Sequence, residues 1–278
     1  MTDLARAFVP GHVTGFFSVE EDDDPTRAGS RGGGIVLSSG ATVTVRPADR
    51  RQVLLDGESI EMAPVERVLD ALEATAEVQI ATDLPVGAGF GVSGAASLGA
   101  ALAANAAFDR RLSENELCTI AHGAEVQSGT GLGDVVAQAR GGVPIRLEPG
   151  GPQDNLLDAI PARGRIEYHS FGEVDTAAVV GEETEAIDAA GERALSAVVA
   201  EPTVDRFMRA SRRFARESGL LTDRVREAIE AVAEAGGSAT MGMLGETVVA
   251  LGTGLSDAGY EPAACRIHPG GASLEERP

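Results

Sequence analysis

The sequence predicts an α+β protein built from two domains. The chain has 278 residues, 43 % of them apolar, so it can bury a sizeable core in one large domain or two smaller ones. Strand patterns and helical patterns are mixed along both halves of the chain. A cluster of glycine and proline at residues 148–152 marks a boundary between them. We therefore expect one domain over residues 1–150 and a second over residues 151–278.

The first half is predicted to begin with a strand from Ala5 to Val9 that ends at Pro10-Gly11. Residues 34–37 and 41–46 alternate as a hairpin across Ser38-Ser39-Gly40. The acidic run at residues 22–24, followed by Pro25, predicts a solvated loop. The later elements of this half are a strand over 52–55, a helix over 64–75 that Pro64 starts, a strand over 77–82, a glycine-rich turn over 84–94, a helix over 95–108 and a helix over 113–126 that Ser113 and Glu116 cap.

The second half is predicted to place helices between strands. Apolar residues at helical spacing, such as Val225, Ile229 and Val232, support the helices. The expected elements are strands over 165–169 and 176–180, helices over 191–199, 204–217 and 222–235, and strands over 238–243 and 247–251.

The charge of the chain excludes several kinds of site. The 43 acidic residues outnumber the 23 basic residues, which gives a formal net charge of −20, and every one of the basic residues is arginine. Without lysine there is no P-loop lysine, no Schiff base and no lysine-bound pyridoxal phosphate. Nucleic acid is a poor partner, because its phosphate backbone needs a cationic footprint.

The same composition resembles that of proteins from salt-in halophilic microbes, with an acidic mesophilic protein from a GC-rich genome as the alternative. Carboxylates hold hydration water, and concentrated salt screens their repulsion. Cys118 and Cys265 form no CxxC motif, which fits a reducing cytosol. No segment has the ~20 apolar residues of a membrane span, and we see no signal peptide. We expect a soluble cytoplasmic protein that acts on a small molecule; the oligomeric state stays open, a homodimer included.

A glycine-rich segment between a strand and a helix is the most informative part of the chain. It places alternating glycines at positions 87, 89 and 91 before the helix. Such glycines allow a sharp turn, and the free N–H groups of the helix start bind an anion without any lysine. Tight packing of strand on helix is the alternative interpretation. A dinucleotide fold is disfavoured, since its motif follows the first strand and precedes an acidic residue.

This segment resembles the central motif of the GHMP kinases, Pro-x-Gly-x-Gly-Leu-Gly-Ser-Ser-Ala-Ala. The resemblance implies a two-domain fold with a ribosomal-S5-like first domain and a ferredoxin-like second domain, and it implies ATP as cofactor. The ATP-binding residues would be Pro85, Gly87, Ala88, Gly89, Gly91, Val92, Ser93, Gly94 and Ala95. Val92 replaces the first serine of the motif and Gly94 an alanine, whereas Ser93 keeps the position whose hydroxyl ligates Mg²⁺.

Three further segments resemble the family in the same order. Residues 7–13 match its Ala-Pro-Gly-Lys-Val segment with His12 in place of the lysine, and residues 235–242 are similar to its third glycine-rich loop. The run from Glu125 to Asp134 resembles that of mevalonate kinases, although its spacing of nine is shorter than expected. By this match Glu125 is a Mg²⁺ ligand and Asp134 the catalytic base. Phosphoryl transfer needs a metal-held phosphate beside a carboxylate that orients the hydroxyl. The alternative interpretations are that Asp134 caps a helix or strand and that Glu125 is an exposed carboxylate at a helix end.

Within the family, residues 9–17 resemble the Pro-Gly-His-x-Thr-Gly-Phe-Phe signature of the archaeal pantoate kinases. That resemblance implies ATP-dependent phosphorylation of the 4-hydroxyl of pantoate on the way to coenzyme A, and an archaeal source agrees with the halophile-like composition. The alternatives are another GHMP kinase, acting on homoserine, shikimate or mevalonate, and a non-catalytic nucleotide-binding module. Val92 and the missing lysine favour the module.

Pantoate requires a cation for its carboxylate and a base at its terminal hydroxyl. Arginine is the only permanent cation in the chain, and its fork suits a carboxylate. The candidates are Arg31, which precedes three glycines, and Arg140, which precedes two, with a plain surface role as the alternative for each. We expect His12, Thr14 and Ser30 to supply neutral hydrogen bonds to the substrate.

Overall fold

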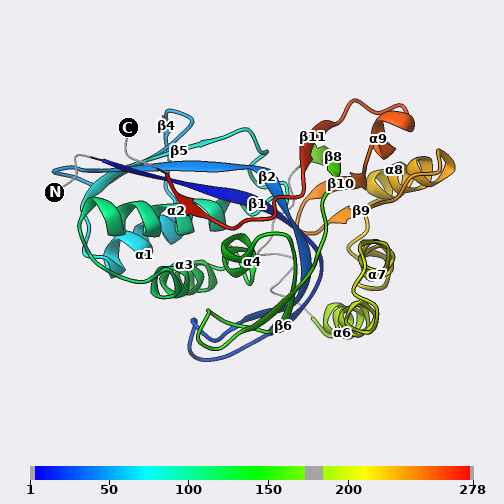
Figure 1. The fold of residues 1–278 in the computed structure, drawn as a ribbon, viewed down its shortest axis with the longest axis horizontal. Coiled ribbons are helices and arrows are strands. Elements are labelled where there is room, and N and C mark those ends of the chain that lie inside the picture. The colour runs from blue at the N-terminus through cyan, green and yellow to red at the C-terminus, as the bar shows by residue number, and fades with distance from the viewer. Residues whose placement is uncertain (1–3, 173–183, 276–278) are drawn as a thin grey trace.

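The computed structural model describes residues 4–172 and 184–275 and has the predicted α+β class (Figure 1). Two antiparallel-rich sheets lie at opposite ends of the molecule, each with its own helices. The strand predicted at residues 176–180 lies outside the described residues. Among the helices within the described ranges, none has the length and apolar character to cross a membrane.

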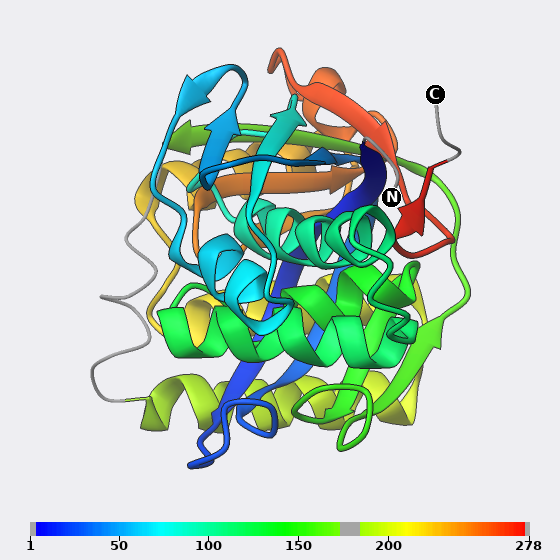
Figure 2. The same ribbon diagram turned by 90° about the vertical axis from the view of Figure 1, so that its left-hand side faces the viewer.

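The first sheet is made from the first half of the chain and its last few residues. Its strand order is β12-β1-β2-β5-β3-β4, and β6 pairs with β2 and β7. The strands are β1 (Ala5–Glu20), β2 (Gly29–Pro47), β3 (Gln52–Leu55), β4 (Glu58–Ser59), β5 (Ala76–Thr82), β6 (Val143–Glu148), β7 (Leu156–Ile160) and β12 (Ser273–Leu274). Helices α1 (Ala63–Ala71), α2 (Val92–Ala107) and α3 (Glu114–Ser128) lie together on one face of it, and α4 (Asp134–Arg140) follows them (Figure 2).

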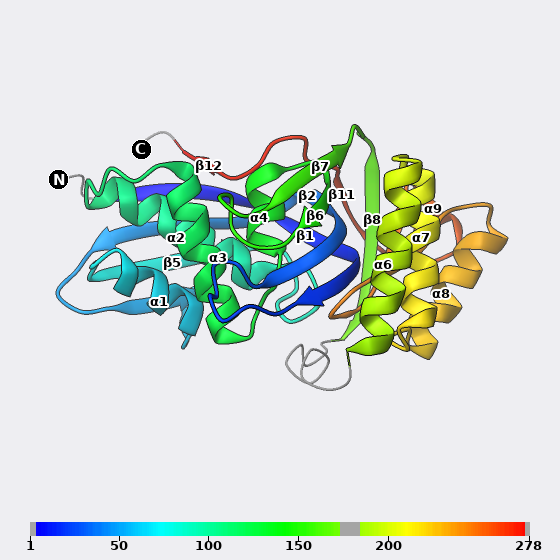
Figure 3. The same cartoon turned by 90° about the horizontal axis from the view of Figure 1, so that it is seen from below.

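The predicted hairpin across residues 38–40 is wrong. Residues 29–47 form the single strand β2, and β1 continues through Pro10-Gly11 to Glu20. The pairing shifts register at this point, since Pro10 lies opposite Gly40 and His12 lies opposite Val36. Extra residues in one strand of a pair make a bulge that bends the strand without ending it. The bend carries β1 and β2 toward the second half of the chain (Figure 3).

The second sheet has the strand order β11-β8-β10-β9. With β8 as its first strand in the chain this is the order 4-1-3-2 of a split βαβ, ferredoxin-like fold. Its elements are β8 (Arg165–Gly172), α6 (Glu185–Ala200), α7 (Val204–Glu217), α8 (Asp223–Glu234), β9 (Ala239–Gly242), β10 (Glu246–Leu251), α9 (Gly254–Asp257) and β11 (Ala263–Arg266). The three predicted helices are confirmed, and α6 begins six residues earlier than expected. Because β7 still pairs with β6, the chain changes sheet after residue 160 and not at residue 150.

Aromatic side chains of β1 hold the two halves together. Phe16 packs against Phe207 with ring centres 5.7 Å apart, and Phe17 packs against Phe214 at 5.5 Å. All four rings are buried, so Phe16 and Phe17 belong to the core. The bent part of β1 is therefore fixed from both sides, and the residues beside it are held in defined positions.

Candidate active site

A cavity of about 390 Å³ opens where the two halves of the chain meet. The glycine-rich loop with the start of α2 forms one wall, and Asp134 of α4 lies directly beside that helix start. Thr14 of β1 also lines the cavity. Met62 closes one side, and Met243 with Leu244, in the turn between β9 and β10, closes another. The predicted third glycine-rich loop, residues 235–242, supplies none of the lining residues, because most of it precedes or forms β9; the turn that follows β9 lines the cavity in its place.

The glycine-rich loop gives the cavity a wall of backbone N–H groups. Gly87, Gly89 and Gly91 all have positive φ, from 63° to 83°, which L side chains rarely adopt. Gly91 is the N-cap of α2, so the first N–H groups of that helix have no partner within the helix. Among the helices that the structure describes, α2 is the one without an acidic residue in its first turn. Although the chain has a net charge of −20, the N-terminal turn of α2 carries no carboxylate that would repel an anion, so this helix end suits phosphate.

A buried carboxylate lies beneath the start of α2. Glu125, 2 % exposed, accepts a hydrogen bond from Ser93 Oγ at 2.8 Å and from Ser97 Oγ at 2.7 Å, both on Oε1. Its other oxygen, Oε2, accepts from Thr130 Oγ1 at 2.9 Å. Burial raises the pKa of Glu125; the three hydroxyls act in the opposite direction, and the Asp134 carboxylate adds to the rise. Of these hydroxyls, those of Ser93 and Thr130 belong to residues that line the cavity.

A magnesium ion suits this end of the cavity. Mg²⁺ prefers oxygen ligands and is commonly held by one or two carboxylates together with substrate phosphates. Glu125 and the Ser93 hydroxyl offer such oxygens beside the helix end, so the donors fit the ion. Within the described residues no group of three or more His, Cys, Asp or Glu side chains is arranged to hold a metal without phosphate.

Asp134, beside the start of α2, is held by a buried histidine. His12 Nδ1 lies 2.7 Å from Asp134 Oδ1, and the His12 side chain is fully buried while that of Asp134 is 19 % exposed. Burial lowers the pKa of His12, more than the contact with Asp134 raises it. Burial acts to raise the pKa of Asp134, but the His12 hydrogen bond and the charge of Arg146 outweigh it, and the pKa lies below its ordinary value. An ionised carboxylate only accepts, so the neutral imidazole donates from Nδ1.

A buried arginine stands behind Asp134. Arg146, in β6, is 2 % exposed, and burial lowers its pKa to about 10, so it stays a cation at neutral pH. It donates to the Ser30 carbonyl from Nε at 3.3 Å and to Ser30 Oγ from Nη2 at 3.2 Å. Its Nη1 has no hydrogen-bond partner among the described residues. His122 is buried near the same cation, bonded through Nε2 to the Ala28 carbonyl at 2.8 Å.

The structure brings together most of the predicted site residues. Those that line the cavity are Thr14, Gly87, Gly89, Gly91, Val92, Ser93 and Asp134. Those that support it from behind are His12, Ser30, Ala88, Gly94, Ala95 and Glu125, and Pro85 is exposed at the entrance to the loop.

The two arginines predicted to bind the carboxylate lie elsewhere. Arg140 is exposed at the far end of α4, and Arg31 is engaged by Glu192 and by the Leu147 carbonyl. A different arginine, Arg146, which we did not predict, lies near Asp134, although it is not among the residues that line the cavity. The signal for it in the sequence is a cation inside the apolar strand run Val143–Leu147.

Comparisons with known proteins agree with this geometry. Residues 63–142 match the family model of the GHMP kinases N terminal domain. The chain is 35 % identical to a pantoate kinase of Methanospirillum hungatei, over 96 % of this chain and 95 % of that one, and 34 % identical to a pantoate kinase of Thermococcus kodakarensis, over 81 % and 79 %. A solved phosphotransferase related to the coenzyme A biosynthesis pathway superposes with a TM-score of 0.88 at 29 % identity, over 98 % of both chains. The chain therefore belongs to the pantoate kinase family of the GHMP kinases.

Proposed function

We propose that this protein transfers the γ-phosphoryl group of ATP to the 4-hydroxyl of pantoate, giving ADP and 4-phosphopantoate. One observation carries the proposal: a buried arginine with an unpartnered Nη1 lies near an ionised carboxylate, and that carboxylate lies beside the helix end that suits phosphates. Pantoate has a carboxylate and a terminal hydroxyl on one small frame, so it offers a partner to both groups.

The phosphate end neutralises the triphosphate. The N–H groups at the start of α2 face the phosphate oxygens, and the alternating glycines let the backbone approach them. We assign Ser93 and Glu125 as the protein ligands of Mg²⁺, which supplies charge neutralisation to the phosphates when it is bound. In phosphoryl transfer this positioning and neutralisation account for most of the catalysis.

The acceptor end holds pantoate and its reacting proton. Arg146 receives the carboxylate with Nη1, and Ser30 fixes the guanidinium that makes this contact. Asp134 accepts the proton of the 4-hydroxyl. The oxygen of that hydroxyl bonds to the γ-phosphorus, and the bond from this phosphorus to the β–γ bridging oxygen breaks. Phe90 and Met243 provide apolar lining for the two methyl groups.

His12 has a different role from the one that the sequence predicts. It is fully buried against Asp134, so we assign it to holding that carboxylate in place and ionised. Neutral hydrogen bonds to the substrate then come from Thr14, which lines the cavity.

Two alternatives differ from this proposal at specific residues. A kinase of homoserine, shikimate or mevalonate would use Asp134 and the glycine-rich loop in the same way and would differ in its use of Arg146. A non-catalytic nucleotide-binding module has no use for a carboxylate kept ionised by a buried histidine, and the His12–Asp134 pair therefore disfavours it.

We also infer the setting in which the protein acts. Its 43 acidic residues and lack of lysine support a halophilic source, and its two buried, unpaired thiols support a cytoplasmic location. The oligomeric state stays open, a homodimer included.

The experiment that tests the proposal is a parallel acceptor assay in concentrated KCl with Mg²⁺ and ATP. Pantoate, homoserine, shikimate and mevalonate are supplied separately, ADP release is followed, and phosphorus NMR identifies the product. We expect turnover with pantoate and a phosphate monoester on its terminal oxygen. Turnover with another acceptor alone would overturn the substrate, and no turnover by folded protein with any acceptor would overturn the kinase.

A further inference from the structure

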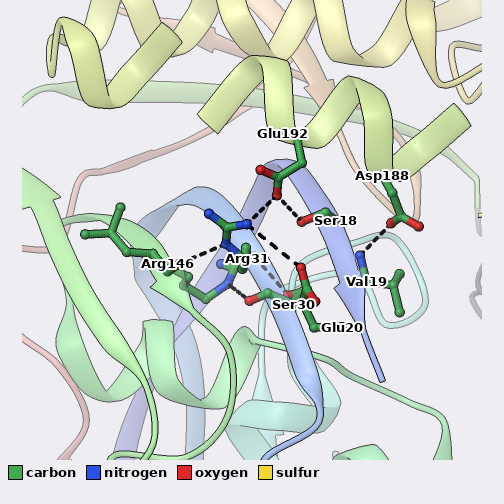
Figure 4. Close-up of polar contacts among 9 residues, drawn as sticks. Ser18, Val19, Glu20, Ser30, Arg31, Arg146, Asp188 and Glu192 are labelled. Atoms are coloured by element: carbon green, nitrogen blue, oxygen red, sulfur yellow. Dashed lines mark hydrogen bonds and ion pairs between the residues drawn. The ribbon is translucent and has the colours of Figure 1, made fainter. Parts of the chain in front are cut away.

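A polar network joins α6 to the strands beside Arg146 (Figure 4). Arg31 of β2 donates from Nη1 to Glu192 Oε1 of α6 at 2.8 Å, and the same oxygen accepts from Ser18 Oγ of β1 at 3.1 Å. Arg31 also donates from Nε to the carbonyl oxygen of Leu147 in β6 at 2.8 Å. One guanidinium therefore links three elements: its own strand, β6 and α6.

The two strands that Arg31 links carry the residues assigned to the substrate carboxylate. The pairing of β2 with β6 reaches its end at Gly32, which lies opposite Arg146. The bond from Arg31 to the Leu147 carbonyl comes one residue beyond this end and so continues the junction of the two strands. Arg31 follows Ser30 in the chain, and Leu147 follows Arg146. The Arg31–Leu147 hydrogen bond thus fixes the residue that follows Ser30 and the residue that follows Arg146.

Helix α6 reaches these strands because it lies very close to β1. A Cβ at Gly191 would be 2.1 Å from the carbonyl oxygen of Phe17, so a side chain there would push the helix away. Next to this contact Glu192 meets Arg31. One turn earlier Asp188 accepts a hydrogen bond from the Val19 backbone N–H at 2.7 Å. Both carboxylates lie on one face of α6, directed at the ends of β1 and β2 (Figure 4).

The Arg31–Glu192 pair has little to do with folding. The two side chains are 29 % and 44 % exposed, and ion pairs at such positions contribute little to stability. Its effect is geometric. The guanidinium is a planar, rigid fork, so an Nη1 held at Glu192 determines where Nε points. Glu192 thereby keeps Nε directed at the Leu147 carbonyl.

We propose that Arg31 and Glu192 are positioning residues that set the orientation of the Arg146 guanidinium and so the affinity for the acidic substrate, without touching it. This inference rests on the proposed function, in which Arg146 binds the substrate carboxylate. Loss of either residue raises KM for pantoate. It leaves kcat and KM for ATP near those of the wild type, because Asp134 and the start of α2 are unchanged.

The test compares R31Q, E192Q and the double variant in the same assay, with melting temperatures to verify folding. Each single variant is expected to raise KM for pantoate by about tenfold, since a small misplacement of a binding group is costly. The double variant is expected to resemble the single variants, because each substitution weakens or removes the same Arg31–Glu192 link. The matched control is R213Q, which breaks the exposed Arg213–Glu217 pair on α7 and is expected to change none of these constants.

Two further variants separate the ways in which the inference can fail. If R146M leaves KM for pantoate unchanged, the carboxylate assignment itself is wrong. If R146M raises that KM whereas R31Q and E192Q do not, the proposed function stands and the positioning role is overturned. An equal rise in D188A, which removes the acceptor of the Val19 N–H but leaves the Arg31–Glu192 pair in place, would attribute the effect to loosening of α6 and would also overturn the role.

Discussion

The two ends of the cavity are built in different ways. At the phosphate end, one continuous segment presents backbone N–H groups, and the residues from Gly87 to Ser93 follow one another in the chain. At the acceptor end, side chains from distant positions meet, with His12 and Asp134 separated by 122 residues and Ser30 and Arg146 by 116. The first end needs a local turn, whereas the second needs the whole fold.

The difference follows from what each end binds. In the proposed function, phosphate is recognised by N–H groups that every residue carries, a role that needs neither a serine at Val92 nor any lysine. The acceptor is recognised in that proposal by buried charges, and a buried charge is costly unless it is paired. Asp134 is stabilised by the His12 hydrogen bond and by the charge of Arg146, and Arg146 is stabilised by the charge of Asp134. A substitution at either residue therefore also affects the other, which makes the acceptor end the more sensitive to substitution.

The largest effect is expected for D134N, at the acceptor end. The amide keeps the shape of the side chain and a contact with His12 but cannot take the proton of the hydroxyl. We expect kcat to fall by about 10²–10⁴-fold. The melting temperature also falls, because the buried Arg146 loses the opposite charge near it. The control is D83N, an exposed aspartate just before the glycine-rich loop, which should stay close to wild type. Retention of most of the turnover by D134N would remove Asp134 from the chemistry.

A smaller effect is expected at the phosphate end, where two serines bind the same oxygen of Glu125. Ser93 lines the cavity and Ser97 is fully buried. We expect S93A to lower kcat/KM for Mg·ATP by about tenfold or more, and S97A to cost about 1 kcal/mol of folding stability with activity close to wild type. Steady-state kinetics with varied Mg²⁺ and urea denaturation separate the two. Equal losses of activity in both variants would mean that both serines act only by holding Glu125.

A still smaller effect is expected for G94A, which restores the alanine of the family motif. A Cβ at Gly94 would lie 2.9 Å from Gln138 Oε1 and 3.2 Å from Asp134 Cβ, so the end of the Gln138 side chain has to shift and Asp134 has to give by a few tenths of an ångström. Overpacking of this kind costs about 1–3 kcal/mol, and we expect a lower melting temperature together with a several-fold lower kcat. The control is G164A, whose Cβ would enter open space. A G94A protein as active as wild type would show that Asp134 tolerates the displacement.

The smallest effect is a dependence of stability on pH. Burial lowers the pKa of both His12 and His122 below 6.5. As pH falls below that value the unfolded chain takes up protons first, so the free energy of unfolding decreases; above it, the contribution of the neutral imidazoles is complete. Urea denaturation at about pH 7.5 and about pH 5.5 measures the decrease, which should be smaller in H122N. An identical decrease in H122N would exclude His122 as a source.

Local features of the fold could be predicted from the sequence. The Ser113–Glu116 capping box of α3, the apolar face of α8 and the turn before α2 all depend on residues within a few positions of one another. For the same reason the phosphate end could be located before the fold was known.

Features that depend on distant partners could not be predicted. The bulge between β1 and β2 resembles a turn until the opposing strand is known, and β12 joins the first sheet from the other end of the chain. The burial of Arg146 could not be predicted for the same reason. Whether an arginine in a strand is exposed or buried depends on Ser30 and Asp134, which come from other elements.

The central claim is that Arg146 recognises the carboxylate of the acceptor that Asp134 activates. The most direct measurement compares kcat/KM for pantoate with that for neopentyl glycol, which keeps the two methyl groups and a terminal hydroxyl but has no carboxylate, in wild type and in R146M. Wild type is expected to prefer pantoate strongly, and R146M to lose about 100-fold of that preference, because the charge that it removes has no partner in the diol. A fall in activity by the same factor for both acceptors would contradict the claim.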